Sequence, residues 1–384
     1  MEFDFLTPID PTIIAFAKKL GNQQLGTIIK KYEYNNFPDL KDVQIAFFGV
    51  LEYRNSSHEL VMTKSLDKVR KSTYSLYSGN WNIKIADIGD IKVGANIADT
   101  YFALREIMTE LLKKNIKIIC LGGSQDLTYP IYRCFDNLDQ MVNLVAVDNK
   151  FDLGNVDEAI SDKNYLSKII IDEPNNLNNY SNIGFQTYYN AQDEINLIQK
   201  LHYDAYRLGE ITSKTELCEP ILRNADFLSI DLSALKSTER DDKIKFEPNG
   251  FDGKELCAIG RYAGISDTLS VCGIFDLNGT TQEANLVSQL IWYFLEGVNL
   301  REIEHPNLQD DVFLKYMVTA DDQEITFFKS TKTQRWWILV PIFYNGNNKT
   351  SKESLLPCTH DDYLNCCQEQ IPERWWKAQQ KSVV

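Results

Sequence analysis

The stretch Ile116-Lys-Ile-Ile-Cys-Leu-Gly-Gly-Ser-Gln-Asp126 joins a short apolar run to a loop rich in glycine and polar residues. Similar apolar runs lead into the segments Asp148-Asn-Lys-Phe-Asp152 and Ser229-Ile-Asp-Leu-Ser-Ala-Leu-Lys236. Continuous apolar runs of this length are typical of parallel strands that are buried on both faces. Because the carboxyl ends of parallel strands meet at one edge of an open α/β sheet, we expect the three polar segments to share one crevice.

Strand and helix patterns alternate between residues 43 and 295. Residues 95–114, for example, carry apolar side chains at helical spacing, whereas residues 144–147 and 227–230 form short continuous apolar runs. About eight such repeats predict a three-layer α/β/α domain with a mostly parallel sheet of about eight strands, since parallel strands need crossover connections.

The pattern changes after residue 304. Residues 311–319, 323–329 and 335–341 predict an antiparallel meander, and a short helix is expected near residues 361–370. Adjacent residues of a strand face opposite sides of the sheet, so the side chains of Trp336 and Trp337 must pack against different elements. We expect the tail to fold back with Trp375 or Trp376; an oligomer contact or a ligand platform is the alternative. The predicted units are an N-terminal helical extension (1–40), the α/β domain (41–303) and a C-terminal β appendage with its tail (304–384).

Composition restricts the function classes. The net charge of -14 and the pI near 4.9 argue against nucleic-acid binding, which needs a basic face. No apolar run is long enough to span a membrane, and the chain does not start like a secretory signal, so a cytoplasmic protein is expected. The eight cysteines form no C-x-x-C pair, which favours reduced, buried thiols.

The ordered motifs Gly-Gly-x-x-x-Leu, Asp-x-x-x-Asp and Ser-x-Asp-x-x-x-Leu resemble those of the arginase, agmatinase and formimidoylglutamase family of ureohydrolases. Supporting segments are Ile183-Gly184, Arg207-Leu-Gly209 and Asp276-Leu-Asn278, and the resemblance covers roughly residues 40–300. The segments Arg335-Trp-Trp337 and Pro372-Glu-Arg-Trp-Trp376 are similar to the C-terminal extension of a formimidoylglutamase-like branch. The resemblance implies an arginase-like fold and assembly as a homo-oligomer.

The family chemistry implied by this resemblance uses two manganese ions, bridged by carboxylates, to make a hydroxide that attacks an amidine or guanidinium carbon. Asp148, Asp152 and Asp231 match three of the expected aspartate ligands. The other three ligand positions hold a different residue: Gln125 and Lys150 in place of two histidines, and Ser233 in place of an aspartate. Half of the implied ligand set is therefore missing.

Three neighbouring positions are candidates for binding a ligand. Ser124 stands where the family has an aspartate before the first histidine, and Asn149 lies inside the second motif. Asp276 stands at the position of the late glutamate that would hold the substrate's guanidinium group.

The remaining donors support two interpretations. Asp148, Asp152 and Asp231, with the amide oxygen of Gln125, could hold a single hard cation such as Mn²⁺ or Mg²⁺. Alternatively, the ammonium group of Lys150 replaces the second metal, because a fixed positive charge repels a divalent cation and neutralises the same carboxylates.

A crevice that holds several carboxyl groups cannot stay fully ionised and dry without a partner. A retained metal, raised carboxyl pKa values with an internal Lys150 network, or a bound small organic cation would each resolve this; we favour the second, with no cofactor. The predicted function is then a catalytically silent relative that binds a small ligand or a protein partner. One alternative is a single-metal hydrolase of C–N bonds in compounds of the formimidoylglutamate, agmatine or arginine type. Another is a purely structural oligomerisation protein.

Overall fold

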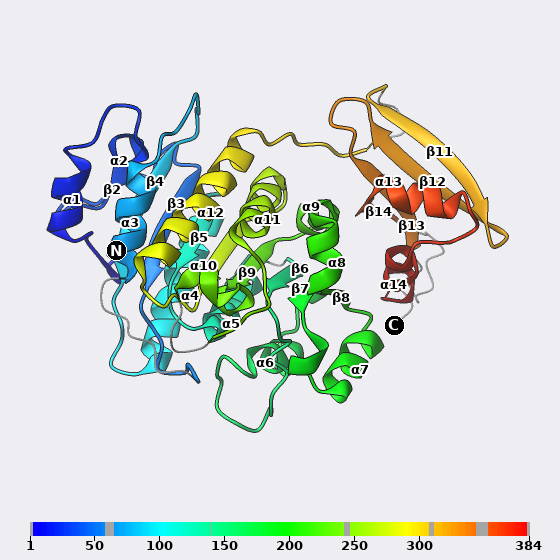
Figure 1. Ribbon diagram of the computed structural model, residues 1–384, viewed down its shortest axis with the longest axis horizontal. Coiled ribbons are helices and arrows are strands. Elements are labelled where there is room, and N and C mark those ends of the chain that lie inside the picture. Colours follow the sequence, from blue (N-terminus) through cyan, green and yellow to red (C-terminus); the bar gives the residue numbers. More distant parts are fainter. Residues whose placement is uncertain are drawn as a thin grey trace.

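The computed structural model describes residues 3–57, 65–138, 140–241, 246–306, 311–342 and 352–381. A large α/β domain holds most of these residues, and a smaller antiparallel sheet follows it at one end of the molecule (Figure 1). The N-terminal segment lies at the opposite end (Figure 1). Among the described residues, no helix is long and apolar enough to cross a membrane.

The main sheet confirms the predicted mostly parallel architecture. Among the described residues it has ten strands in the order β1-β4-β3-β5-β10-β9-β6-β7-β8, with β2 also paired to β4. Only the β1–β4 pair is antiparallel within this part of the chain. The strands are β1 (Leu6–Thr7), β2 (Lys30–Lys31), β3 (Ile45–Val50), β4 (Ile85–Ile91), β5 (Lys117–Leu121), β6 (Val142–Val147), β7 (Leu177–Phe185), β8 (Asp204–Arg207), β9 (Phe227–Asp231) and β10 (Val271–Phe275).

Helices cover both faces of this sheet. One apolar core lies under α1 (Pro11–Ala17), α3 (Ser65–Ser75), α8 (Leu208–Ser213), α9 (Cys218–Arg223), α11 (Gly253–Ile265) and α12 (Thr281–Asn299). The other lies under α4 (Ile97–Lys113), α5 (Thr128–Tyr132), α6 (Tyr165–Ile171) and α7 (Gln192–Lys200). Strand residues alternate between the two cores: in β3, Phe47 packs in the first and Phe48 in the second. This period of two explains why the central strands read as continuous apolar runs.

Shorter elements connect these layers. They are α2 (Leu25–Ile28), α10 (Ser237–Arg240) and the 3₁₀ turns η1 (Gln125–Leu127), η2 (Arg133–Leu138), η3 (Thr187–Tyr189), η4 (Thr215–Leu217) and η5 (Leu232–Ala234). The first 40 residues, which we expect to be helical, hold α1 and α2 but also β1 and β2, which join the sheet through β4. Two-residue strands carry too little apolar pattern to be visible in a sequence.

The C-terminal sheet has one strand more than predicted. It consists of β11 (Phe313–Ala320), β12 (Gln323–Ser330), β13 (Trp336–Ile342) and β14 (Lys352–Cys358), paired antiparallel in chain order. The prediction missed β14, which contains Pro357 opposite Trp337. Proline cannot donate to a strand ladder and is tolerated at sheet edges, which is where β14 lies.

The tail folds back onto this sheet as α13 (His360–Cys366) and α14 (Glu373–Lys381). Trp336 stacks on Tyr363 of α13, with ring centroids 4.9 Å apart. Trp375 is buried, and its indole N–H donates to the carbonyl oxygen of Leu339 at 3.0 Å. Trp337 faces the α/β domain, where the guanidinium of Arg223 lies 4.5 Å from its ring centroid. Both tryptophans of β13 are therefore packed inside the chain.

Candidate functional site

Four adjacent strands in the middle of the main sheet, β5, β10, β9 and β6, deliver the predicted site residues. Their order in the sheet places the loops after all four side by side at the carboxyl edge. The loop after β5 carries Ser124 and Gln125, and the loop after β10 starts with Asp276. Asp231 ends β9, and the segment after β6 begins with Asp148. The predicted convergence of these segments is confirmed.

Backbone geometry at the end of β5 requires glycine. Gly122 and Gly123 have φ values of 85° and 79°, which side chains rarely tolerate. A Cβ atom on Gly123 would lie 2.1 Å from Cδ1 of Leu127 and 3.0 Å from the carbonyl oxygen of Glu52. The Gly123 carbonyl accepts a hydrogen bond from the Asp276 backbone N–H at 2.9 Å, which joins the loops after β5 and β10.

The carboxyl groups of Asp148 and Asp152 form a desolvated pair. Oδ1 of Asp148 accepts the backbone N–H of Lys150 at 2.8 Å, and Oδ2 is buried with no hydrogen-bond partner in the described structure. Burial, followed by the charge of Asp231, raises the pKa of Asp148 to about 7. Burial and the neighbouring Asp148 also raise the pKa of Asp152 well above its usual range, while the charge of Lys150 opposes the rise. Both carboxyl groups are therefore harder to ionise than a solvent-exposed aspartate.

Both carboxylate oxygens of Asp231 are occupied by Ser233. Oδ1 accepts the Ser233 backbone N–H at 2.6 Å, and Oδ2 accepts the Ser233 hydroxyl at 2.7 Å. The carbonyl oxygen of Ser233 in turn accepts the side-chain amide of Asn149 at 3.1 Å. Ser233, at the position where the resemblance implies an aspartate ligand, thus satisfies a neighbouring carboxylate from within the chain.

Lys150 is half-buried at the rim of this cluster. Its ammonium nitrogen lies 5.9 Å from the ring centroid of Tyr189, and its carbonyl oxygen accepts the side-chain amide of Asn182 at 2.8 Å. Within the described ranges no ion pair joins Lys150 to the aspartates. Its charge acts on Asp152 through space, so the crevice shows raised carboxyl pKa values without a closed Lys150 salt-bridge network.

Several buried polar atoms in the crevice have no partner in the described chain. They are Oδ2 of Asp148, Oδ1 of Asn149, Oδ1 of Asp276 and Nε2 of Gln125. Burial and then the charge of Asp231 raise the pKa of Asp276 well above its usual range. Since buried polar groups in folded proteins normally have partners, this concentration of unpaired atoms indicates a place for a polar ligand or water.

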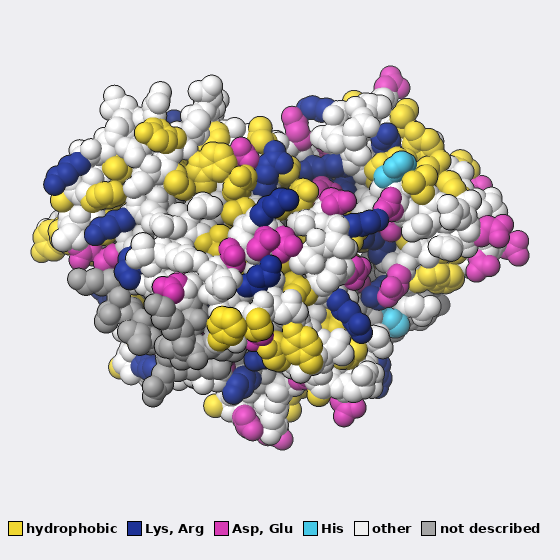
Figure 2. Space-filling view, in the orientation of Figure 1, with side chains coloured by type: hydrophobic (Ala, Val, Ile, Leu, Met, Phe, Trp, Pro, Cys, Tyr) yellow, Lys and Arg dark blue, Asp and Glu magenta, His cyan; other side chains and the backbone are white. Residues whose placement is uncertain are grey.

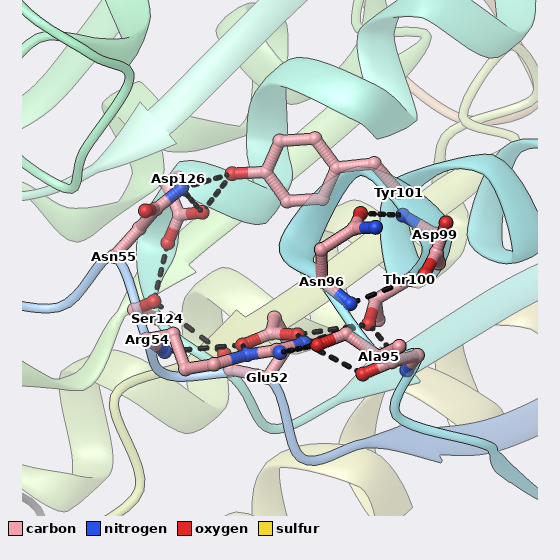
Figure 3. Close-up of polar contacts among 11 residues, drawn as sticks. Glu52, Arg54, Asn55, Ala95, Asn96, Asp99, Thr100, Tyr101, Ser124 and Asp126 are labelled. Atoms are coloured by element: carbon pink, nitrogen blue, oxygen red, sulfur yellow. Dashed lines mark hydrogen bonds and ion pairs between the residues drawn. The ribbon is translucent and has the colours of Figure 1, made fainter.

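Sequence reasoning missed a hydrogen-bond network beside the crevice (Figure 3). The carboxyl group of Asp126 accepts hydrogen bonds from Ser124, Tyr101 and Asn55. Burial raises its pKa to about 6. The hydroxyl of Ser124, a predicted ligand contact, is therefore already bonded within the chain. Asp126 stands in the first motif, but the family resemblance directs attention to Gln125 before it.

The donor set does not fit the implied dinuclear manganese centre. An ammonium-bearing lysine and a hydroxyl already bonded to Asp231 occupy two of the ligand positions. In the part of the chain that the structure describes, no three His, Cys, Asp or Glu side chains are arranged to hold a metal ion. His360 stacks on Trp336 in the C-terminal sheet, and His58 lies outside the described residues.

The fold and the crevice define a three-layer α/β protein with an acidic site at the carboxyl edge of its parallel sheet. The sequence model of the Arginase family matches residues 32–277, and the chain belongs to this family. A sequence search among curated proteins returns no significant match.

Solved structures share this fold at low sequence identity. The formiminoglutamase of Trypanosoma cruzi, determined with Mn²⁺, gives a TM-score of 0.65 at 15% identity over 73% of this chain and 99% of its own. The formimidoylglutamase of Bacillus subtilis gives 0.63 at 15% identity, covering 73% of this chain and 93% of its own. A hypothetical agmatinase of Burkholderia thailandensis gives 0.58 at 14% identity, covering 68% and 88%.

Proposed function

We propose that this arginase-family chain binds a small organic cation of the amine, amidine or guanidinium class in its acidic crevice, without metal-dependent hydrolysis. The observation that carries the proposal is the pair of buried acceptor oxygens, Oδ1 of Asn149 and Oδ1 of Asp276, that have no donor in the described chain. Ammonium and guanidinium groups offer only hydrogen-bond donors and a positive charge, so they complement such a set.

The same residues argue against the family's hydrolysis. That reaction depends on a metal-activated hydroxide, and loss of the ion removes the nucleophile itself. Here Ser233 bonds both oxygens of Asp231, and burial raises the pKa of both Asp148 and Asp152. The ammonium group of Lys150, at a position where the resemblance implies a histidine ligand, repels a divalent cation.

Calorimetric titration of agmatine into chelator-treated protein tests the binding half of this proposal. Agmatine should bind the metal-free protein, and Asp276→Asn should weaken binding about tenfold or more, because asparagine cannot ionise to pair with the cation. Asp157→Asn, at an exposed position outside the crevice, is the matched control and should leave the affinity unchanged. Absence of binding to the wild-type protein, or equal affinity in the Asp276 variant, would refute the proposal.

A hydrolase that uses a single Mn²⁺ or Mg²⁺ is the second candidate. Family membership supports it, as does the unpartnered Oδ2 of Asp148 beside the Gln125 amide. This candidate predicts release of formamide from formimidoylglutamate, or of urea from agmatine or arginine, only after metal is added. The cation-binding proposal predicts no such release with or without metal.

A further inference from the structure

A separate cavity of about 450 Å³ opens at the ends of β7 and β8. Arg207, the last residue of β8, and Lys236, which follows η5, both line it. Gly209 in the first turn of α8 forms part of the wall, and a Cβ atom placed on it would meet nothing within 4 Å. The cavity lies within the size range of small-molecule sites in proteins.

The two cations of this cavity have no ion-pair partner among the described residues. Arg207 is exposed, and its guanidinium lies 5.9 Å from the ring centroid of Phe185. The chain has 54 acidic residues against 40 basic ones, so partners for cations are abundant elsewhere. Two unpaired cations facing one cavity in so acidic a chain indicate an oxyanion site.

The polar neighbours of the cavity are already bonded to one another. The side chains of Gln186 and Asn249 are joined by a hydrogen bond of 2.9 Å. Glu255 also lines the cavity, but its Oε2 accepts the backbone N–H of Asp252 at 2.9 Å as part of a helix cap. The carboxylate of Glu255 is therefore held at the start of α11, and with Arg207 and Lys236 the three charged side chains of the lining leave a net positive charge of one.

We infer that this cavity, named here the Arg207 pocket and lined by Arg207, Lys236 and Gly209, binds a small oxyanion, either a carboxylate or a phosphate group. The guanidinium fork matches the two oxygens of either group, and the lysine adds a second positive charge from an adjacent loop. The Arg207 pocket is not the acidic crevice, so this inference does not depend on the proposed cation binding. The two sites adjoin through the backbone, since the Gln186 N–H donates to the Asn149 carbonyl at 3.0 Å.

Calorimetric titration of the full-length protein at low ionic strength, with succinate and separately with inorganic phosphate, tests the inference. At least one of the anions should bind. Arg207→Gln and Lys236→Gln should each weaken that binding about tenfold, because each removes a charge-assisted contact. Binding of succinate alone assigns a carboxylate ligand, and binding of phosphate alone assigns a phosphate-bearing one; either result supports an oxyanion site.

A steric variant keeps the test decisive if a charge variant folds poorly. Gly209→Leu adds a large side chain to the wall of the Arg207 pocket while it retains both cations and suits a helix better than glycine, so it should weaken binding. The double variant Lys71→Gln/Lys200→Gln removes two positive charges from exposed positions, one more than either pocket variant, and should still bind like the wild type. The inference is overturned if neither anion binds the wild-type protein, if the pocket variants bind normally, or if the exposed-lysine control weakens binding as much as they do.

Discussion

Replacing Asp148 by asparagine should change how the stability of this protein depends on pH. Asparagine keeps the side-chain oxygen that accepts the Lys150 backbone N–H, but it cannot ionise. In the wild type, burial and the charge of Asp231 raise the pKa of Asp148 from 3.8 to about 7. The folded protein therefore holds a proton between these pH values that the unfolded chain has already released.

The sign and size of the effect follow from this difference. Because the folded state binds more protons, stability is lost as pH rises from about 4 to 7, and the loss is complete above that range. A shift of about three pH units at about 1.4 kcal/mol each gives a ceiling of about 4 kcal/mol. Asp148→Asn should remove much of this loss, so the variant should be more stable than the wild type at pH 8.

Urea unfolding at pH 5, 6, 7 and 8, followed by circular dichroism, measures the effect. Asp157→Asn, at an exposed position, should keep the wild-type pH dependence. The reasoning fails if Asp148→Asn leaves the pH dependence unchanged, or if the variant is less stable than the wild type at pH 8.

Two further substitutions test the packing around the site and the C-terminal sheet. Gly123→Ala should lower the free energy of unfolding by about 2 kcal/mol or more, because the new Cβ would lie 2.1 Å from Leu127 at a φ of 79°. Urea unfolding measures this loss, with Gly209→Ala, whose Cβ meets nothing within 4 Å, as the control. Equal losses in the two variants would contradict the prediction. Arg223→Met should lower the free energy of unfolding by about 3 kcal/mol, because the carbonyl oxygens of Trp336 and Cys358 lose this donor and Trp337 loses the cation over its ring. Limited proteolysis should then release the C-terminal sheet faster than in the wild type. A variant as resistant to proteolysis as the wild type would contradict this prediction.

The position of the site was predictable because the topology of a parallel sheet fixes it. Apolar runs before Gly122, Asp148 and Asp231 identify three strands whose carboxyl ends must share an edge. The distribution of charge over the surface was not predictable from the sequence. On the face shown in Figure 2, acidic and basic side chains are interspersed rather than gathered into one charged surface.

Long-range side-chain contacts could not be predicted in the same way. Asp126 collects donors from residues 25 and 71 positions away, Tyr101 and Asn55, and only the folded arrangement brings them together. The ammonium group of Lys150 lies over Tyr189 rather than in an ion pair with the aspartates. The position of Lys150 in the motif does not predict which rotamer its side chain adopts. The fourth C-terminal strand was missed because Pro357 argues locally against a strand.

The most direct test of the account is titration of Mn²⁺ into chelator-treated wild-type protein and into the variant Gln125→His/Lys150→His/Ser233→Asp, with formamide and urea release measured in parallel. The account predicts no stoichiometric binding and no hydrolysis in the wild type, and a gain of Mn²⁺ binding in the variant, which restores the missing donors. Stoichiometric Mn²⁺ binding by the wild type, accompanied by turnover of an amidine or guanidino compound, would contradict it.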